Sequence, residues 1–313
     1  MSHDSVPSAI EDFGDVFEPS EAAEPILSRP VRSALLEWLT EIFADDELKA
    51  VGIKARKRSL FDGPPGVGKT TLAHHLSARL GLRMVAVRPE RLIAKWLGST
   101  GRNIGALFDA ASASDPQIVL FIDEFDAIGL KRTEAEQSCD SERNAWVNTL
   151  LQRIEQYDGF LIAATNHAKH IDPAIWRRFE MHISLELPGQ FERRHILARY
   201  LAPFGLPGTA LGALAEACET ASPALMRQFC EGLKRQMIIG PKCGWSMVRE
   251  SVIERLITTI HPHPDLGKPR LWSHGAKDAA IKLLPWPLPQ AAEVAEPPPG
   301  RPSVDNVVKF ASA

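Results

Sequence analysis

The chain has 313 residues, of which 44% are hydrophobic and 24% are charged, so it is long enough for two compact units with buried cores. Its formal net charge of -3 excludes a global positive field that would recruit nucleic acid or an anionic membrane surface. No apolar run approaches the roughly 18 residues of a membrane span, and the four cysteines are widely spaced without a CxxC pattern. We therefore expect a cytoplasmic protein with reduced thiols and no membrane insertion.

The first 24 residues are strongly acidic and contain no lysine or arginine. Their seven carboxylates are those of Asp4, Glu11, Asp12, Asp15, Glu18, Glu21 and Glu24. Such a segment is typical of a mobile acidic arm, and we expect residues 1–24 to form one. A segment that docks on a partner is the alternative, because a short apolar stripe runs through Ile10, Phe13, Val16 and Phe17.

An α/β domain is predicted for residues 25–188. Apolar residues recur at helical spacing over residues 26–51, and short apolar runs bounded by turn residues follow at 58–63, 83–87, 117–123, 160–166 and 181–187. Helix-like stretches separate these runs. This alternation predicts a parallel five-stranded sheet flanked by helices.

The strand pattern ends at Pro188. Helical periodicity over residues 189–260 predicts a small all-helical domain, with the last helix at 245–260. Beyond it, residues 261–313 are rich in proline, and we expect an extended or disordered C-terminal tail. Its KPRLW and LLPWPL pieces could still pack against the body or a partner.

A phosphate-binding loop is predicted after the first strand, because residues 63–70 fit the pattern G-x-x-x-x-G-K-[ST]. The glycines allow backbone N–H groups to point at phosphate oxygens, and the following helix adds its positive N-terminal dipole. Lys69 would neutralise the β- and γ-phosphates, and the Thr70 hydroxyl would bind Mg²⁺. The predicted nucleotide-binding residues are Gly63, Pro64, Pro65, Gly66, Val67, Gly68, Lys69, Thr70 and Thr71.

A second element of a hydrolytic nucleotide site follows the apolar run at 117–122, where Asp123 and Glu124 stand together. Asp123 would hold the water shell of the Mg²⁺ ion, and Glu124 would activate the attacking water as a general base. Ligands of open α/β sheets bind at the carboxyl ends of the strands, where both motifs are expected to lie. The sequence therefore predicts ATP and Mg²⁺ as cofactors.

With these two motifs, the chain resembles the AAA+ ATPases, and more narrowly the AAA group that includes katanin, spastin and the vacuolar-sorting ATPases. The resemblance covers about residues 26–240 and implies a P-loop AAA+ module with a helical lid domain. It implies that Asn166, after the run FLIAAT, orients the lytic water as the first sensor. It also implies that Arg177 and Arg178, in IDPAIWRRFE, reach the γ-phosphate held by the next subunit.

Arginines that reach the nucleotide of the next subunit imply a homo-oligomeric ring, most often a hexamer. In the resembling families, an aromatic residue in a loop of the central pore grips a polypeptide substrate. The tetrapeptide KWLG, formed by Lys95, Trp96, Leu97 and Gly98, matches the form of that loop. Taken alone, Trp96 would be a core residue beside a turn. With the other motifs, it favours a motor that unfolds, disassembles or remodels a protein by threading it through the ring.

Two other functions remain open. A loader or clamp on nucleic acid is one, although the negative net charge and the single basic cluster at 54–58 make nucleic acid an unexpected partner. An interaction scaffold that binds ATP without turnover is the other. The chain has no HExxH motif, so degradation of a substrate would need a separate protease, and the two terminal segments could recruit an adaptor. Arg227 could replace a second sensor arginine or be a surface charge.

Overall fold

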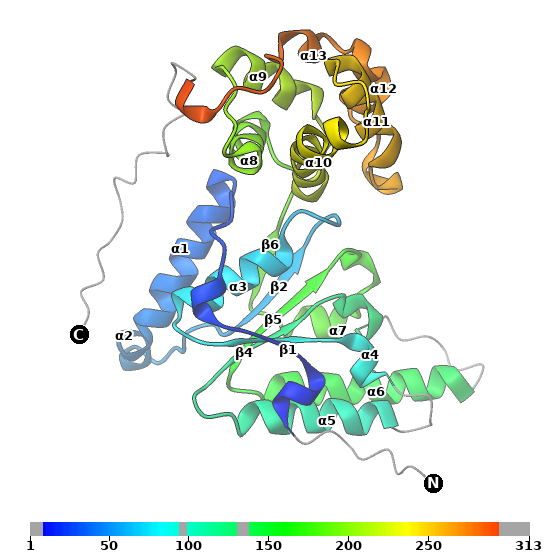
Figure 1. Ribbon diagram of the computed structural model, residues 1–313. Coiled ribbons are helices and arrows are strands. Elements are labelled where there is room, and N and C mark those ends of the chain that lie inside the picture. Colours follow the sequence, from blue (N-terminus) through cyan, green and yellow to red (C-terminus); the bar gives the residue numbers. More distant parts are fainter. Residues whose placement is uncertain (1–8, 94–98, 130–137, 294–313) are drawn as a thin grey trace. The chain divides into compact units, whose positions relative to one another are not determined.

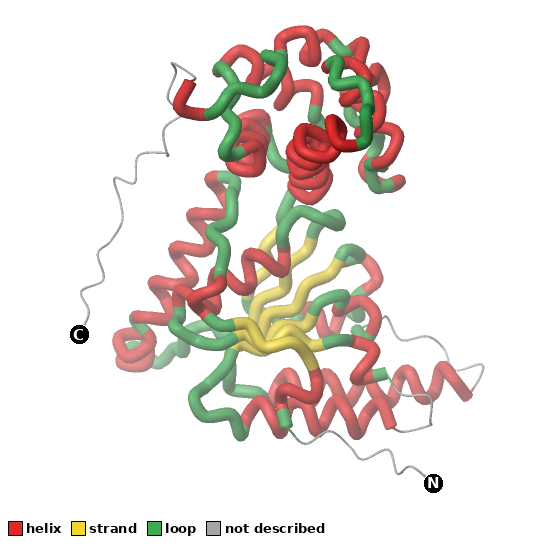
Figure 2. The backbone as a smooth tube through the Cα atoms, viewed as in Figure 1, coloured by secondary structure: helices red, strands yellow, loops and turns green. Residues whose placement is uncertain are grey.

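The computed structural model describes residues 9–93, 99–129 and 138–293, and no side chain is described for residues 138–143 or 293. The chain divides into two compact units, Met1–Glu186 and Leu187–Ala313. The sequence places this division at residue 188. Figure 1 labels elements of both units where there is room, and Figure 2 distinguishes the sheet from the helices by colour.

The first unit is built on a six-stranded sheet with the order β1-β3-β4-β5-β2-β6. Its strands are β1 (Gly14–Phe17), β2 (Arg58–Asp62), β3 (Met84–Val87), β4 (Val119–Ile122), β5 (Phe160–Thr165) and β6 (Met181–Ser184). The five strands predicted from the apolar runs are confirmed, and all their pairings are parallel. The expected number of strands was one too few, because β1 adds an antiparallel edge strand.

Strand β1 corrects the prediction of a mobile acidic arm, which is wrong for the segment that contains it. Phe13 and Ile10 are buried in the core, with exposed fractions of 0% and 8%. The carboxylate of Asp15 pairs with the guanidinium of Arg88, whose Nε and Nη2 lie 2.9 Å and 2.6 Å from its oxygens. Apolar anchors therefore hold this segment on the sheet, and an arginine from β3's end offsets one of its negative charges.

Helices cover both faces of the sheet. They are α1 (Arg29–Phe43), α2 (Asp45–Ala50), α3 (Lys69–Arg79), α4 (Pro89–Leu92), α5 (Ser99–Ser112), α6 (Ser138–Gln156) and α7 (Pro173–Trp176). In Figure 1, α5 and α6 run side by side on one face, while α1 and α3 lie on the other. Successive β2 residues follow this division, because Leu60 belongs to the core on the α5–α6 side and Phe61 to the core on the α1–α3 side.

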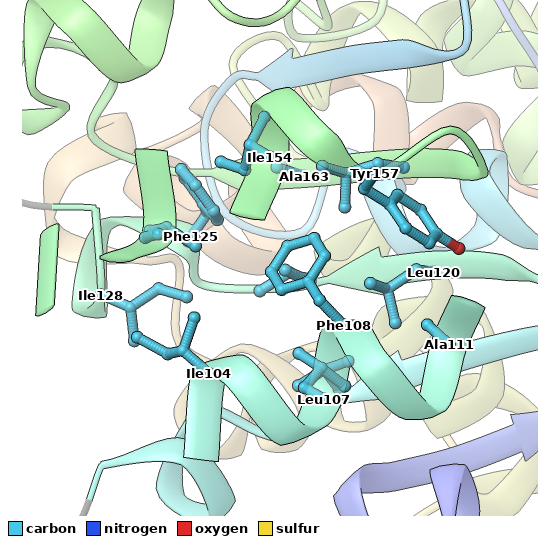
Figure 3. Close-up of a cluster of buried hydrophobic side chains, with 14 of the residues drawn as sticks. Ile104, Leu107, Phe108, Ala111, Leu120, Phe125, Ile128, Ile154, Tyr157 and Ala163 are labelled. Carbon is cyan, nitrogen blue, oxygen red and sulfur yellow. The ribbon is translucent and has the colours of Figure 1, made fainter. Parts of the chain in front are cut away.

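The core on the α5–α6 side is aromatic at its centre. Phe108 of α5 meets Tyr157 edge-on, with ring centroids 5.5 Å apart, and Figure 3 shows both rings between the helix and the sheet. Burial raises the pKa of the Tyr157 phenol to about 12. This packing fixes the end of α6 and the turn before β5.

The second unit is helical, as predicted, but it is larger than the expected lid domain. Its helices are α8 (Gln190–Leu201), α9 (Gly208–Ala217), α10 (Pro223–Lys242), α11 (Arg249–Thr259), α12 (Arg270–His274) and α13 (Ala279–Leu283). Helices α12 and α13 lie in the stretch that we expected to be an extended or disordered tail. That expectation is wrong for residues 264–291.

Buried side chains explain this second correction. Trp272 is 3% exposed and donates its Nε1–H to the Ile260 carbonyl at 2.7 Å, and Ile281 is fully buried. Asp278, also buried, caps α13 and lies 3.0 Å from Arg270 Nε. The prolines separate short helical turns here, and the residues between them supply the core. None of the helices in the described ranges is long and apolar enough to cross a bilayer.

The edge strand gives a prediction about stability. Phe13→Ala should lower the free energy of unfolding by about 3 kcal/mol, because it removes a fully buried ring. Phe43→Ala is the matched control, since Phe43 is 55% exposed and its loss should cost at most about 0.5 kcal/mol. Urea denaturation followed by tryptophan fluorescence measures both. Equal shifts for the two variants would contradict the packing of residues 9–21 on the sheet.

Candidate active site

The predicted phosphate-binding loop joins β2 to α3 and needs glycine for its backbone path. Gly63 has φ 147°, and a Cβ there would lie 2.1 Å from the Leu185 carbonyl oxygen. Gly68 has φ 100° and caps the N-terminus of α3 in a left-handed conformation. A side chain at either position would strain the loop, so the glycines allow it to wrap closely around a phosphate.

The Lys69 side chain lies under this loop and is 7% exposed. Its Nζ donates to the carbonyls of Gly63 at 2.7 Å and Pro64 at 3.0 Å. A third bond reaches the Asn166 side chain, whose Oδ1 lies 2.6 Å from Nζ. The ammonium therefore joins the loop after β2 to the loop after β5.

Burial lowers the pKa of the Lys69 ammonium. The nearby carboxylates of Asp123, Asp126 and Asp62 act in the opposite direction but do not cancel the effect of burial. A partly desolvated ammonium favours the binding of an anionic ligand, because a phosphate beside it would stabilise the charged form.

Thr70 and Asp123 lie together at the same edge of the sheet. Thr70 Oγ1 donates to Asp123 Oδ2 at 2.8 Å, and Asp123 Oδ1 accepts from the Glu124 backbone N–H at 2.9 Å. A hydroxyl and a carboxylate oxygen are hard ligands of the kind that Mg²⁺ prefers. Within the described ranges no group of three or more His, Cys, Asp or Glu could hold a metal ion.

Glu124 is exposed and begins the turn after β4. Its backbone has φ 47° and ψ 42°, a left-handed conformation that costs a residue with a side chain on the order of 1–3 kcal/mol. Asn166, also exposed, follows β5, which lies next to β4 in the sheet. The structure thus brings the predicted residues of the loop, Asp123, Glu124 and Asn166 to one edge of the sheet.

Two residues beside this group were not singled out from the sequence. Buried Thr165 donates its hydroxyl to Asp126 Oδ1 at 2.6 Å and accepts from the His167 backbone N–H at 2.9 Å. Their only sequence signal was position, since Asp126 lies two residues after Glu124 and Thr165 directly precedes Asn166.

Arg177 and Arg178 lie elsewhere. Both are exposed and precede β6, whose first residue, Met181, pairs with Ser59 near the start of β2. The phosphate-binding loop leaves the other end of β2, about 13 Å away along the strand. Arg178 forms an ion pair with Glu155 at 3.2 Å. The structure does not bring the arginine pair to the nucleotide loop of the same chain.

Lys95, Trp96, Leu97 and Gly98 lie outside the described residues. Arg227 is an exposed side chain of α10 that pairs with Glu231 at 2.7 Å.

Comparison with known proteins finds a family match for part of the chain. Residues 59–187 match the family described as "ATPase family associated with various cellular activities (AAA)". The chain is 42% identical over 177 residues to the uncharacterized AAA family ATPase y4kL of Sinorhizobium fredii, covering 56% of this chain and 52% of that protein. It is 37% identical over 183 residues to the proteasome-activating nucleotidase of Thermococcus onnurineus, covering 56% and 45%. The chain spans about half the length of these relatives.

The fold is also known from solved structures. The crystal structure of the FIGL-1 AAA domain superposes with a TM-score of 0.62 at 22% identity, covering 80% of this chain and 87% of that one. The same domain has been solved in complex with ADP. At this identity the likeness shows the fold.

The position of Lys69 predicts how nucleotide affinity depends on it. Lys69→Met should weaken the affinity for fluorescent ATP about 10- to 100-fold, because charge-assisted bonds to phosphate are lost. Its pKa is lower in the folded than in the unfolded chain, so the folded chain binds fewer protons between these two values. The free energy of unfolding of the wild type therefore rises with pH between the folded-state and unfolded-state pKa of Lys69. Lys69→Met should not show this rise.

Lys49→Met is the matched control, because Lys49 lies on α2 and pairs with Asp45 at 2.7 Å. Fluorescence titration should give wild-type affinity for this variant. Equal losses in the two variants would contradict a specific phosphate contact of Lys69.

Proposed function

We propose that residues 59–187, which match the AAA family model, form an ATPase domain, and that the chain is a Mg²⁺-dependent ATPase that remodels a polypeptide from within a homo-oligomeric ring. One observation carries the proposal. The ammonium of Lys69 and the Thr70–Asp123 pair lie at one edge of the sheet, while the two arginines lie at the other. Each chain would thus hold most of one hydrolytic site and supply the two arginines for the site in another copy.

The proposed chemistry assigns one task to each group at the nucleotide edge. ATP would supply the phosphoryl group that is transferred to water, and Mg²⁺ would supply positive charge beside it. Lys69 would neutralise phosphate charge, and Thr70 and Asp123 would hold the metal directly or through water. Glu124 would take a proton from the attacking water, whose oxygen bonds to the γ-phosphorus as the bond to the ADP leaving group breaks, and the Asn166 amide would orient that water.

The ring follows from the position of the arginine pair. Arg177 and Arg178 are exposed and precede β6, at the opposite ends of the strands from the phosphate-binding loop of their own chain. A planar guanidinium that stays charged can instead bind the phosphate held by another copy, in the bidentate manner that arginine favours. We therefore propose that both are supplied in trans. A hexamer is the assembly that the family resemblance implies.

A polypeptide is the proposed substrate. The name of one relative, the proteasome-activating nucleotidase, supports work on proteins, and a separate protease or adaptor would then act with the ring. Lys95, Trp96, Leu97 and Gly98 would form the loop that grips the substrate. An aromatic side chain suits this task because apolar contact holds side chains of many kinds.

Complementation between two inactive variants tests the ring. Glu124→Gln and Arg178→Ala should each lower the rate of ATP hydrolysis about 10³-fold, since one lacks the base and the other the cation. In a 1:1 mixture, roughly a quarter of the interfaces combine an intact Glu124 with an intact Arg178, so activity should return toward that fraction. Phosphate release measured against protein concentration should also show a cooperative onset for the wild type.

Arg235→Ala is the control for loss of an exposed, ion-paired arginine, because Arg235 is 69% exposed and pairs with Glu231. It should keep wild-type turnover. A mixture that assembles but stays as inactive as its components would rule out catalysis in trans. Wild-type protein without turnover at any concentration would favour the ATP-binding scaffold.

The substrate-gripping residue has its own test. Trp96→Ala should keep basal ATP hydrolysis within about threefold of wild type and lose the ability to unfold a green fluorescent protein with an unstructured tail, because the grip is lost and the site is not. Loss of fluorescence with ATP is the readout. Trp245→Ala is the control, since this tryptophan is 45% exposed on the second unit. Unfolding at the wild-type rate by Trp96→Ala would exclude the threading role.

A further inference from the structure

The proposed base, Glu124, has a left-handed backbone conformation, which is unfavourable for a residue with a side chain. Its φ is 47°, and the other non-glycine residue with positive φ in the described part of the chain is Thr220. Left-handed geometry at a residue with a side chain persists only where the surrounding contacts fix it. The contacts of the turn after β4 therefore decide where the Glu124 carboxylate points.

Some of these contacts are internal to the turn. The Glu124 carbonyl accepts from the Ala127 N–H at 2.8 Å, and the next residue, Phe125, is fully buried. Figure 3 shows Phe125 among the core side chains, and its ring meets Phe179 edge-on with centroids 5.5 Å apart. Apolar packing resists displacement of the turn but has little directional preference, so it does not by itself fix the turn relative to β5.

A directional contact crosses to β5 from the residue after Phe125. Thr165 Oγ1 donates to Asp126 Oδ1 at 2.6 Å, and the same oxygen accepts from the His167 N–H at 2.9 Å. Thr165 is fully buried and is the last residue of β5, directly before Asn166. Its hydroxyl is thus held as donor to one catalytic loop and as acceptor within the other, which fixes the separation of the two loops.

We propose that Thr165 and Asp126 are positioning residues, whose hydrogen bond holds the Glu124 carboxylate and the Asn166 amide in register for hydrolysis. This inference rests on the proposed ATPase function. Neither residue is assigned a contact with the reacting atoms. Thr165 acts through the backbone that it shares with Asn166, and Asp126 acts through the short 3₁₀ helix η3 (Phe125–Ala127) that follows Glu124.

A purely structural role makes a different prediction. A buried hydroxyl bonded to a carboxylate could simply stabilise the fold, and its removal would then lower the free energy of unfolding while the folded protein kept its kcat. A positioning role lowers kcat in the folded protein and leaves nucleotide binding intact, because Lys69 and the phosphate loop are unchanged.

Variants of Thr165 separate the two roles. Thr165→Val keeps the shape and removes the hydroxyl, and it should lower kcat about 10²-fold, the scale of a displaced catalytic group. Its KM for ATP and its affinity for fluorescent ADP should stay within about twofold. Thr165→Ser keeps the hydroxyl and should retain kcat within about threefold. Ser77→Ala is the matched control, since it removes a buried hydroxyl that donates to the His74 carbonyl at 2.8 Å on α3.

Asp126→Ala tests the same bond from its other end and carries the test if Thr165→Val does not fold. Its loss of kcat should be at least that of Thr165→Val, because the variant also removes a carboxylate close to Lys69. The double variant should lose no more than the more affected single one, because both remove a single interaction. Thermal unfolding measured in parallel shows what fraction of each variant is folded.

Several outcomes would overturn the positioning role. They are a kcat for Thr165→Val within about threefold of wild type, a Thr165→Ser variant as impaired as Thr165→Val, or additive losses in the double variant. Glu124→Gln, measured alongside, separates this inference from the proposed function. If Glu124→Gln keeps turnover, the assignment of the base fails. If it abolishes turnover while Thr165→Val does not, only the positioning role fails.

Discussion

The parallel register of β2, β4 and β5 is the constraint on which the candidate site depends. β2 and β5 pair up to Asp62 and Thr165, and β4 runs beside β5 in the same direction, so the loops that follow these strands leave the sheet at one edge. The Lys69 ammonium then bridges the loop after β2 and Asn166, which follows β5. Thr70 contacts the loop after β4 through its hydrogen bond to Asp123. A register slip of one residue would turn each side chain of a strand to the other face and separate these groups.

The same polarity separates Arg177 and Arg178 from the loop after β2 of their own chain. β6 runs parallel to β2, so the turn that precedes it lies at the amino ends of the strands. Arg177 and Arg178 belong to that turn, at the opposite ends of the strands from the loop after β2. Under the proposed function, the two arginines would therefore act on a nucleotide held by another copy of the chain.

The sequence predicted the parts of this fold in which local and global preferences agree. Buried parallel strands are continuous apolar runs, and the loop after β2 needs glycine at fixed positions, so both are visible without a structure. β1 was missed because the strand that it pairs with, β3, begins only at Met84, and because its carboxylates resemble those of a solvated arm. α12 and α13 were missed because Trp272 and Ile281 lie in five-residue helices of a proline-rich stretch, which are too short to show a helical repeat of apolar residues.

The geometry of the site was hidden for a related reason. The Lys69 ammonium is buried and the Glu124 backbone is left-handed, and each of these states is unfavourable by itself. Both are offset by groups distant in sequence, such as Asn166, which is 97 residues from Lys69. A motif reports which residue types the chemistry needs, whereas the contacts that hold them in unfavourable states come from other strands. Thr165 and Asp126, 39 residues apart, form such a contact, and no pattern along the chain could show that they meet.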